Sequence, residues 1–379
     1  MRVGVPSQAP AGETRVALTP DVAGRLAARK LDVVVETGAG ERSHLSDAAF
    51  EKAGARAGSA DEAWGSEIVA VVRAPSAEEI GRLSRGAVLI GFLNPLADAE
   101  TARALASAGV TSFAMEAIPR ITRAQSMDAL SSQATVAGYL AVLLAAENLD
   151  RFFPMLTTAA GTIKPATVLV LGAGVAGLQA IATARRLGAV VTGYDVREAV
   201  REQVESLGAR FLQLELEADA EGAGGYAKEL GEEQQRRQQA AMAEAIGRFD
   251  VVIATAAVPG RRAPLLVTAA AVEGMKPGSV IVDLAAATGG NCELTEPGQT
   301  VERHDVTILG PLDLASEMPE HASQLYARNV QSLLELLVSD EGELVLNWED
   351  EVLAGACITR DGEIVHEGAK QAAGAPAPG

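Results

Sequence analysis

Apolar and polar positions alternate in two patterns along the first third of the chain. Short apolar runs that predict strands occupy residues 2–5, 32–36, 67–72, 87–93 and 110–115. Between them, apolar positions recur with helical spacing near residues 21–30 and 98–108, and Thr19 followed by Pro20 is a suitable start for the first helix. Strands that alternate with helices are typical of a parallel sheet wrapped by helices.

The same alternation resumes after one long apolar helix, which we predict at residues 132–149. Its longest apolar run, residues 136–146, is shorter than the ~20 residues that a membrane span needs, so we expect a buried helix and not an anchor. Beyond it, further strands are predicted at residues 168–171, 190–194, 250–256, 279–284 and 306–309. A chain of 379 residues exceeds the size at which a single core stops growing, so two domains are expected.

We therefore predict an α/β protein of two Rossmann-like domains with parallel sheets and a cleft between them. Residues 1–131 form the N-terminal domain, which residues 319–379 complete, and residues 132–318 form the second domain. A helix predicted near residues 323–337 comes too late to extend the second sheet, so we expect it to pack on the first domain. Residues 369–379 are rich in Ala, Gly and Pro and are predicted to be an unstructured tail.

A dinucleotide-binding fingerprint opens the second sheet. A strand-like run leads directly into Gly172, Gly174 and Gly177, and a helix pattern follows from about Val175. The first glycine permits a tight turn, the second lets the backbone approach a pyrophosphate, and the third lets the helix pack closely on its strand. Asp195 closes the next apolar run, about 20 residues on, where a carboxylate accepts hydrogen bonds from the ribose hydroxyls.

This acid predicts a preference for NAD(H), because a 2′-phosphate would meet a like charge at Asp195. Arg197 complicates the argument, since it could serve a 2′-phosphate if Asp195 turned away. The alternative to nucleotide binding is a merely tight strand-to-helix turn. The ordered succession of strand, glycines, helix, strand and acid favours the nucleotide.

Composition narrows the class of protein. The net charge of −18 argues against a nucleic-acid surface, which would need clustered Lys and Arg. Two cysteines, Cys292 and Cys357, cannot form a disulfide framework, and no signal peptide precedes the first predicted strand, so a cytoplasmic location is expected. The four histidines share no ligand spacing, and no metal site is predicted.

Two polar segments are candidates for chemistry. The segment before the long helix gathers Arg120, Gln125, Asp128 and Ser131 with little apolar periodicity, which suits a cleft at a domain junction. On spacing alone, Asp128 or Ser131 could equally well cap the helix that follows. The other segment, residues 217–240, is polar and glycine-rich, and taken alone it could be a solvated flap or a working lid.

Five motifs together resemble the alanine dehydrogenase/transhydrogenase family, and more narrowly the NAD(H)-binding domain I of proton-translocating transhydrogenases. They are residues 13–20, 120–132, 172–177, 225–227 and 282–293. The match runs from Arg2 to about Val365, and its motifs are specific to the family.

Three positions separate the two branches of that family. Alanine dehydrogenases bind and protonate their substrate with a lysine, a histidine and an aspartate, where this chain has Arg73, Asn94 and Ala287. Neither Asn94 nor Ala287 can exchange a proton near neutral pH, so the substrate apparatus looks absent and Arg15 alone is expected to be structural. The resemblance therefore points to the transhydrogenase branch, with a stand-alone alanine or other amino-acid dehydrogenase as the alternative.

The transhydrogenase resemblance implies direct hydride transfer between NAD(H) bound here and NADP(H) bound on a partner domain, with Arg120, Gln125, Asp128 and Ser131 orienting the nicotinamide. It implies that residues 217–240 are a mobile loop that closes on the nucleotide. Further cofactor-binding residues are expected near the pyrophosphate, the adenosine and the strand edge, and they are Val175, Gly225, Tyr226 and Ala257.

The same resemblance implies several partners. Membrane-spanning domain II and NADP(H)-binding domain III would be on separate chains, and the chain itself would be a homodimer on the cytoplasmic face of the membrane. Proton translocation would belong to the membrane partner. A nucleotide-sensing module without catalysis is a third class of function, against which the complete loop of Arg120 to Ser131 speaks.

Overall fold

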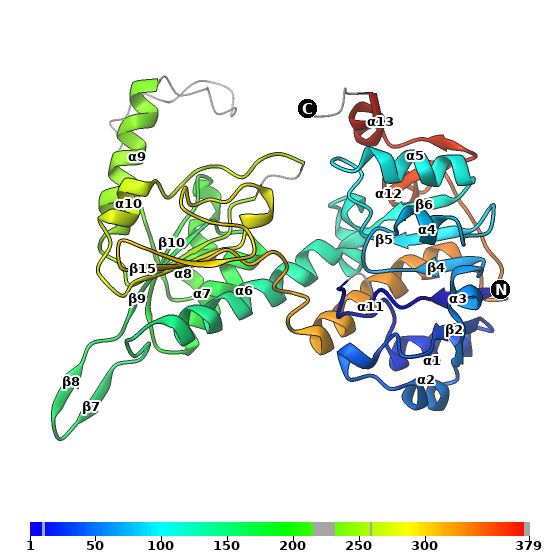
Figure 1. Cartoon of the computed structure of the whole chain (residues 1–379), viewed down its shortest axis with the longest axis horizontal. Helices are drawn as coiled ribbons and strands as arrows, with labels where there is room; N and C mark the ends of the chain where they lie inside the picture. The colour runs from blue at the N-terminus through cyan, green and yellow to red at the C-terminus, as the bar shows by residue number, and fades with distance from the viewer. Residues whose placement is uncertain (10–11, 215–231, 258–259, 375–379) are drawn as a thin grey trace. The chain divides into compact units, whose positions relative to one another are not determined.

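The computed structural model describes residues 1–9, 12–214, 232–257 and 260–374. These residues form two compact units, Met1–Gln133 with Ala315–Gly379 and Ala134–Leu314 (Figure 1). The sequence places the domain boundaries at residues 131/132 and 318/319. In the structure, the first boundary falls within helix α6 (Ala129–Asn148). Each unit is an α/β fold with its own sheet and its own core, as predicted.

The first unit is built on an eight-stranded sheet of order β17-β16-β6-β5-β4-β1-β2-β3. Strands β1 to β6 are parallel, and β16 pairs antiparallel with both β6 and β17. The strands are β1 (Arg2–Val5), β2 (Asp32–Glu36), β3 (Arg56–Gly58), β4 (Ile68–Ala70), β5 (Val88–Gly91), β6 (Thr111–Ala114), β16 (Cys357–Arg360) and β17 (Glu363–Ile364). The order 3-2-1-4-5-6 of the parallel strands is that of a doubly wound sheet.

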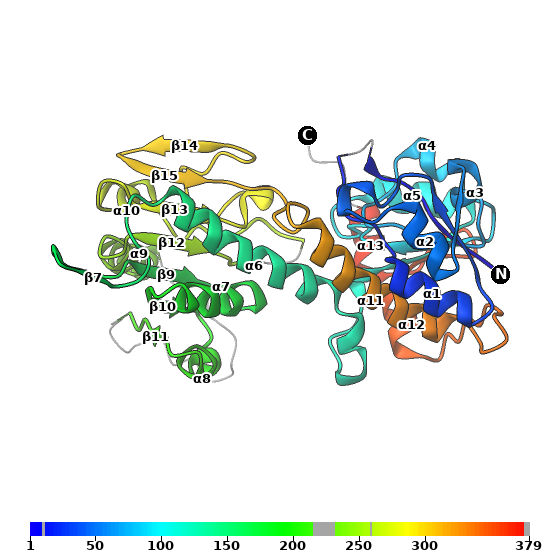
Figure 2. The same ribbon diagram turned by 90° about the horizontal axis from the view of Figure 1, so that it is seen from below.

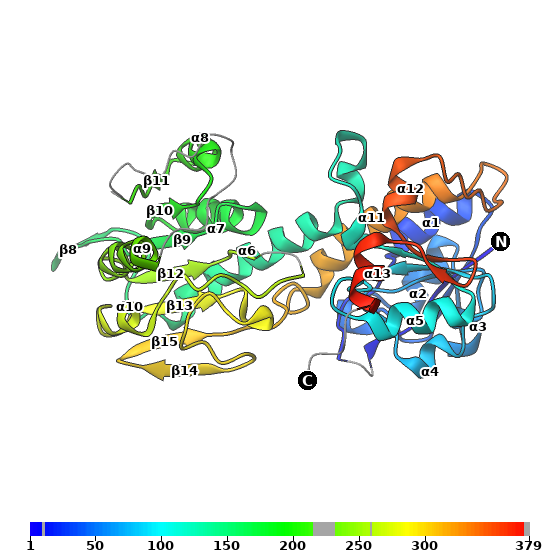
Figure 3. The same cartoon turned by 90° about the horizontal axis from the view of Figure 1, so that it is seen from above.

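Helices cover both faces of this sheet (Figures 2 and 3). Successive residues of β4 point to opposite faces of the sheet, and both faces are apolar. Ile68 packs in the hydrophobic core shared with α1 and α11, whereas Val69 packs in the hydrophobic core shared with α3 and α5. The helices are α1 (Pro20–Ala28), α2 (Asp47–Ala53), α3 (Ala60–Trp64), α4 (Ala77–Ile80), α5 (Ala99–Ala108), α11 (Pro319–Leu337), α12 (Glu351–Ala356) and α13 (Glu367–Gly374).

The second unit is built on a seven-stranded sheet of order β11-β10-β9-β12-β13-β15-β14, in which only β14 runs antiparallel to its neighbour. The strands are β9 (Thr167–Leu171), β10 (Val190–Tyr194), β11 (Arg210–Phe211), β12 (Val251–Ala254), β13 (Val280–Asp283), β14 (Thr300–Arg303) and β15 (Val306–Leu309). Helices α6 and α7 (Val175–Arg186) cover one face, with α8 (Arg201–Ser206) beside them, while α9 (Glu232–Ile246) and α10 (Ala269–Glu273) cover the other (Figure 1). A separate hairpin of β7 (Leu156–Thr158) and β8 (Gly161–Ile163) projects from this unit.

Two segments differ from the sequence-based expectation. The predicted tail begins inside helix α13, because Ala369 is fully buried against the first unit and its amide donates to His366 Nδ1 at 3.2 Å. An Ala- and Gly-rich composition can therefore end in a helix where one small side chain finds a core to enter. Within the predicted mobile loop 217–240, helix α9 begins at Glu232, and residues 215–231 lie outside the described residues.

Helix α6 is apolar all round. Among the described residues it is the one helix long and apolar enough to cross a membrane by length and composition. Ala141, Val142 and Ala145 have no exposed surface and pack in the core of the second unit with β9 and α7. These contacts bury one side of the helix, whereas Leu130 and Tyr139 are 38% and 36% exposed, so the predicted burial describes only part of the helix.

Candidate functional site

The glycine turn joins β9 to α7 in three residues. Gly172 adopts a φ of +95°, in the left-handed region where a side chain would be strained. A Cβ on Gly177 would lie 1.8 Å from the carbonyl oxygen of Gly172, so no other residue fits between helix and strand. Around Gly174, by contrast, a Cβ would meet no described atom within 4 Å. The turn is therefore closed where it packs and open where a ligand would approach.

Helix α7 begins at this open place. Gly174 is its N-cap residue and supplies no side-chain cap, and Val175 at the first helical position is 42% exposed. The first amide groups of a helix have no intrahelical acceptor, and together with the helix dipole they attract anions. A pyrophosphate fits both the charge and the space of this N-terminus.

Asp195 lies beside the glycine turn, directly after β10. Its Oδ2 accepts a hydrogen bond from the amide of Ala173 at 2.8 Å, and its side chain is only 7% exposed. Arg197 folds back onto the same carboxylate, with Nε 2.9 Å from Oδ1 and Nη2 2.9 Å from Oδ2. Burial alone would raise the pKa of Asp195, but the hydrogen bonds from Arg197 and Ala173 lower it below its ordinary value. Asp195 is thus an ionised acceptor at neutral pH, and Arg197 occupies both of its oxygens.

Two side chains without a predicted role shape the next strand edge. Thr255, after β12, donates to the carbonyl oxygen of Gly172 at 3.0 Å and so braces the glycine turn. Asn291 is completely buried and bridges both backbone groups of Ala256, accepting from its amide at 3.1 Å and donating to its carbonyl at 2.8 Å. Ala257, which the sequence places at this edge, follows directly and is exposed. The sequence alone does not reveal these hydrogen bonds, because whether a Thr or Asn near a strand end makes them is clear only when the neighbouring strands are known.

The other two predicted residues of this set, Gly225 and Tyr226, lie outside the described residues. Their assignment to the nucleotide loop stays a prediction.

The polar segment of residues 120–131 belongs to the first unit and surrounds a short 3₁₀ helix, Thr122–Met127. Arg120 and Gln125 are exposed, whereas Asp128 is half-buried. Asp128 accepts from the amide of Ser131 at 2.9 Å and from its hydroxyl at 2.6 Å, which is the geometry of an N-terminal cap on α6. The capping alternative therefore describes what this pair does, and of the four predicted residues Arg120 and Gln125 are the two that face solvent.

The carboxyl edge of the first sheet is filled by the protein's own side chains. Arg15 is buried and pairs with Glu13 at 2.8 Å, and it donates to Gln133 at 3.0 Å, so its predicted structural role agrees with these contacts. Asn94 has a φ of +50°, and its amide and that of Leu93 both donate to Glu116.

The remaining two positions of the dehydrogenase set bring no further acid or base to this edge. Arg73 lies just beyond β4 on the first unit, and Ala287 lies on the second unit. Among the described residues, no group of three His, Cys, Asp or Glu side chains could hold a metal ion.

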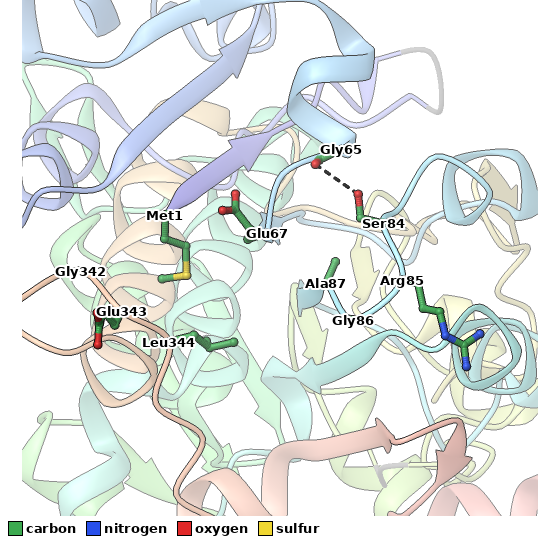
Figure 4. Close-up of a pocket in the computed structure, with 10 residues that line it drawn as sticks. All are labelled: Met1, Gly65, Glu67, Ser84, Arg85, Gly86, Ala87, Gly342, Glu343 and Leu344. Carbon is green, nitrogen blue, oxygen red and sulfur yellow. Dashed lines mark hydrogen bonds between the residues drawn. The ribbon is translucent and has the colours of Figure 1, made fainter.

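A cavity of about 450 Å³ opens at the opposite, amino edge of the first sheet (Figure 4). Met1, Glu67 and Ala87 line it where three strands begin, and Ser84 donates to the carbonyl of Gly65 at its rim. Ligands of open α/β sheets bind outside the carboxyl ends of the strands, so this cavity is not the candidate nucleotide site.

Strand order, glycine turn and terminal acid define the class of protein, a pair of α/β units of Rossmann type. The chain matches the family models "Alanine dehydrogenase/PNT, N-terminal domain" over residues 4–137 and "Alanine dehydrogenase/PNT, C-terminal domain" over residues 141–367. It belongs to the alanine dehydrogenase/PNT family, and both the predicted family and the predicted fold class are confirmed.

Relatives from both branches of the family cover nearly the whole chain. It is 47% identical over 376 residues to the first part of NAD(P) transhydrogenase subunit alpha of Rhodospirillum rubrum, covering 97% of this chain and 98% of that protein. It is 32% identical over 378 residues to alanine dehydrogenase of Mycobacterium tuberculosis, covering 97% and 95%. The crystal structure of transhydrogenase from Sinorhizobium meliloti superposes with a TM-score of 0.85 at 45% identity, covering 97% and 99%.

Proposed function

We propose that the chain is the NAD(H)-binding subunit of a proton-translocating transhydrogenase. Hydride would pass directly between NAD(H) held here and NADP(H) held on a partner domain, and a membrane partner would couple the transfer to proton translocation. The observation that carries the proposal is the ionised Asp195 beside an open glycine turn, in a chain without the proton-transfer residues of the dehydrogenase branch. The higher identity to the transhydrogenase subunit than to the alanine dehydrogenase supports it.

The residues present suit a nicotinamide dinucleotide. The α7 N-terminus and Gly174 would take the pyrophosphate, and Asp195 would accept hydrogen bonds from the adenosine ribose once Arg197 moves aside. The nicotinamide supplies the hydride, which carries two electrons and leaves one ring carbon for another. Such a transfer needs no general acid or base on the protein, only alignment of the rings and exclusion of water.

The loop of the first unit would provide that alignment. Arg120 and Gln125 are exposed and can contact the nicotinamide end of the nucleotide, while Asp128 and Ser131 fix the start of α6 beneath them. We infer that these four residues act by positioning. An amino-acid dehydrogenase would instead need a proton donor near its substrate, where this chain has Asn94 and Ala287.

The R. rubrum relative is named as one portion of an alpha subunit, which indicates a subunit divided over more than one chain. We therefore propose that domains II and III are on separate chains and that this chain is a homodimer attached to the cytoplasmic face of the membrane. Large apolar side chains beside and on the β7–β8 hairpin support a protein contact there, since Phe152, Met155 and Ile163 are 52%, 63% and 49% exposed.

Calorimetric titration of the purified chain with NADH and NADPH tests the proposal, followed by two activity assays. We expect tighter binding of NADH, hydride transfer only when an NADP(H)-binding partner domain is added, and no NADH oxidation with pyruvate and ammonium. Turnover of pyruvate and ammonium by the chain alone would place it with the amino-acid dehydrogenases. Failure to bind NADH would overturn the assignment of Asp195 and the glycine turn.

A further inference from the structure

Helix α11 comes from the far end of the chain and contacts the loop of residues 120–131, which is proposed to align the nicotinamide. Asn329, on this helix, is 7% exposed and uses both ends of its side-chain amide. Its Nδ2 donates to the backbone carbonyl of Ser126 at 2.8 Å, and its Oδ1 accepts from the hydroxyl of Ser132 at 2.7 Å. One buried side chain thus contacts the segment on both sides of Asp128.

The two contacts lie on either side of the half-buried Asp128. Ser126 lies next to Gln125, and Ser132 lies one residue after the Asp128–Ser131 cap, so Asn329 links the 3₁₀ turn to the first turn of α6. Gln133 adds a second tie in the same place, because its Nε2 donates to the carbonyl of Ala322 on α11 at 3.1 Å. The contacts all lie within the first unit.

Only an amide of this size can make both contacts. An aspartate could still accept from Ser132 but could not donate to the Ser126 carbonyl, and a leucine could do neither. Either change leaves the part-buried Ser126 carbonyl without the donor that holds it, so the loop is expected to shift.

We propose that Asn329 is a positioning residue for hydride transfer, which fixes the height and orientation of the loop that carries Gln125 and Asp128. The inference rests on the proposed function, since it assigns a role in aligning the nicotinamide ring. Asn329 is buried behind the loop, so it would act through the loop residues that it holds. Because transfer between two rings depends steeply on their geometry, a loosened loop lowers the rate far more than it lowers affinity.

Three variants test this in the complete complex, with the hydride-transfer rate measured by stopped flow and the Kd of NADH by calorimetry. Asn329→Leu removes both contacts, and we expect the rate to fall about tenfold to a hundredfold with the Kd changed less than about twofold. Asn329→Asp removes the Ser126 contact alone, and Ser132→Ala removes the other together with the hydroxyl's contacts to Ala129 and Gln133, so each should give a smaller loss. The control is Gln331→Leu on the same helix, whose amide donates to the exposed Glu335 at 2.8 Å, and it should transfer hydride at the normal rate.

Thermal melting of each variant separates a local effect from loss of the fold, and Ser132→Ala and Asn329→Asp keep the test valid if Asn329→Leu does not fold. Normal transfer rates in folded variants would overturn the proposal, as would a rate loss explained entirely by weaker NADH binding. If the unmodified protein does not bind NADH, the proposed function fails instead, and the two failures are therefore distinguishable.

Discussion

The two units share a strand order but differ at the first connection from strand to helix. In the second unit, β9 ends at Leu171 and α7 begins at Val175, so the chain crosses the carboxyl edge in a three-residue glycine turn. In the first unit, β1 ends at Val5 and α1 begins only at Pro20. The same sheet edge is thus open in one unit and covered by a long connection in the other.

The long connection fills the first unit's edge with its own polar groups. Gln8 accepts from the amides of Val72 and Arg73 at 2.8 and 2.9 Å, and the ion pair of Glu13 with Arg15 is almost fully buried. Helix α1 begins with a proline, which has no N–H to offer an anion. The strand order therefore creates a potential ligand site at the carboxyl edge of each sheet. Whether a nucleotide can bind there depends on the connection between the first strand and the first helix.

The largest effect is expected from Gly177→Ala. Its Cβ would lie 1.8 Å from the Gly172 carbonyl, so helix and strand must separate, at a cost on the order of 4 kcal/mol and with loss of NADH binding. Gly174→Ala is the matched variant, because its Cβ meets no described atom within 4 Å. We expect it to melt normally but to bind NADH at least about tenfold more weakly, since the Cβ stands where the pyrophosphate approaches.

A steric control from the first unit sharpens this result. A Cβ on Gly4 would lie 1.9 Å from the carbonyl oxygen of Ala63, so Gly4→Ala should also lower the melting temperature. Below that temperature its affinity for NADH should be unchanged. Equal affinity losses in Gly4→Ala and Gly174→Ala would mean that the two units are not functionally distinct.

Glu13→Gln tests whether the polar groups at the carboxyl edge of the first sheet stabilise the fold and do not bind nucleotide. Arg15 would keep its charge in a buried place while it loses the carboxylate of Glu13, which should cost about 3 kcal/mol at neutral pH while NADH affinity stays normal. Burial alone would raise the pKa of Glu13, but the hydrogen bonds and the charge of Arg15 lower it below its ordinary value. A lowered pKa contributes stability above the unfolded pKa, and that stability is lost as the pH falls through the folded pKa.

The difference in melting temperature between Glu13→Gln and the unmodified chain should therefore shrink as the pH falls below about 4. A difference that is constant with pH would show that the carboxylate charge is not what stabilises the pair. Substituting Asp21, whose pair with Arg25 is exposed, should leave melting unchanged at every pH.

Some parts of the molecule can be predicted from its sequence and others cannot. Strands β2 and β15 have the predicted bounds because each has a short β-branched, largely apolar stretch between polar segments, and the glycine turn was readable from spacing alone. The roles of Thr255 and Asn329 were not readable, because each depends on a partner 83 or about 200 residues away. Helix α13 was missed since its burial depends on Ala369 meeting a surface that only the folded first unit provides.

A smaller effect is expected at Asp195, the acid that we propose binds the ribose. Asp195→Ala should weaken NADH binding by about tenfold and narrow its advantage over NADPH, because a charged acceptor is lost. Arg197→Ala should act in the opposite direction. It removes the group that occupies both Asp195 oxygens, so NADH should bind up to about fivefold more tightly, in the range of an ion pair whose arginine is exposed to solvent. Titration of both variants with both nucleotides checks this, and weaker NADH binding in Arg197→Ala would mean that the guanidinium contacts the nucleotide itself.

The smallest effect on stability is expected at a buried carboxylate of the first unit, Glu116, which we compare with a buried carboxylate of the second unit, Asp283. Asp283, at the end of β13, accepts hydrogen bonds from the amides of Ala285, Asn291 and Cys292 and from the hydroxyl of Thr295. Glu116, after β6, accepts only at Oε1, and its buried Oε2 has no hydrogen-bond partner among the described residues. The first carboxylate organises a loop, whereas half of the second is buried without compensation.

Burial raises the pKa of Glu116, so its contribution to stability is present below the unfolded pKa and is lost as the pH rises through the folded one. Glu116→Gln keeps an oxygen for the amides of Leu93 and Asn94 and removes the charge. At pH 8 it should stabilise the protein by about 1 kcal/mol or less, and near pH 4 the gain should vanish because the native carboxyl is then protonated. Asp283→Asn should destabilise at both pH values, since an amide nitrogen would face donors. Thermal melting at the two pH values decides the point, and a Glu116→Gln variant that melts lower at pH 8 would show that the charged form of Glu116 is the one the first unit requires.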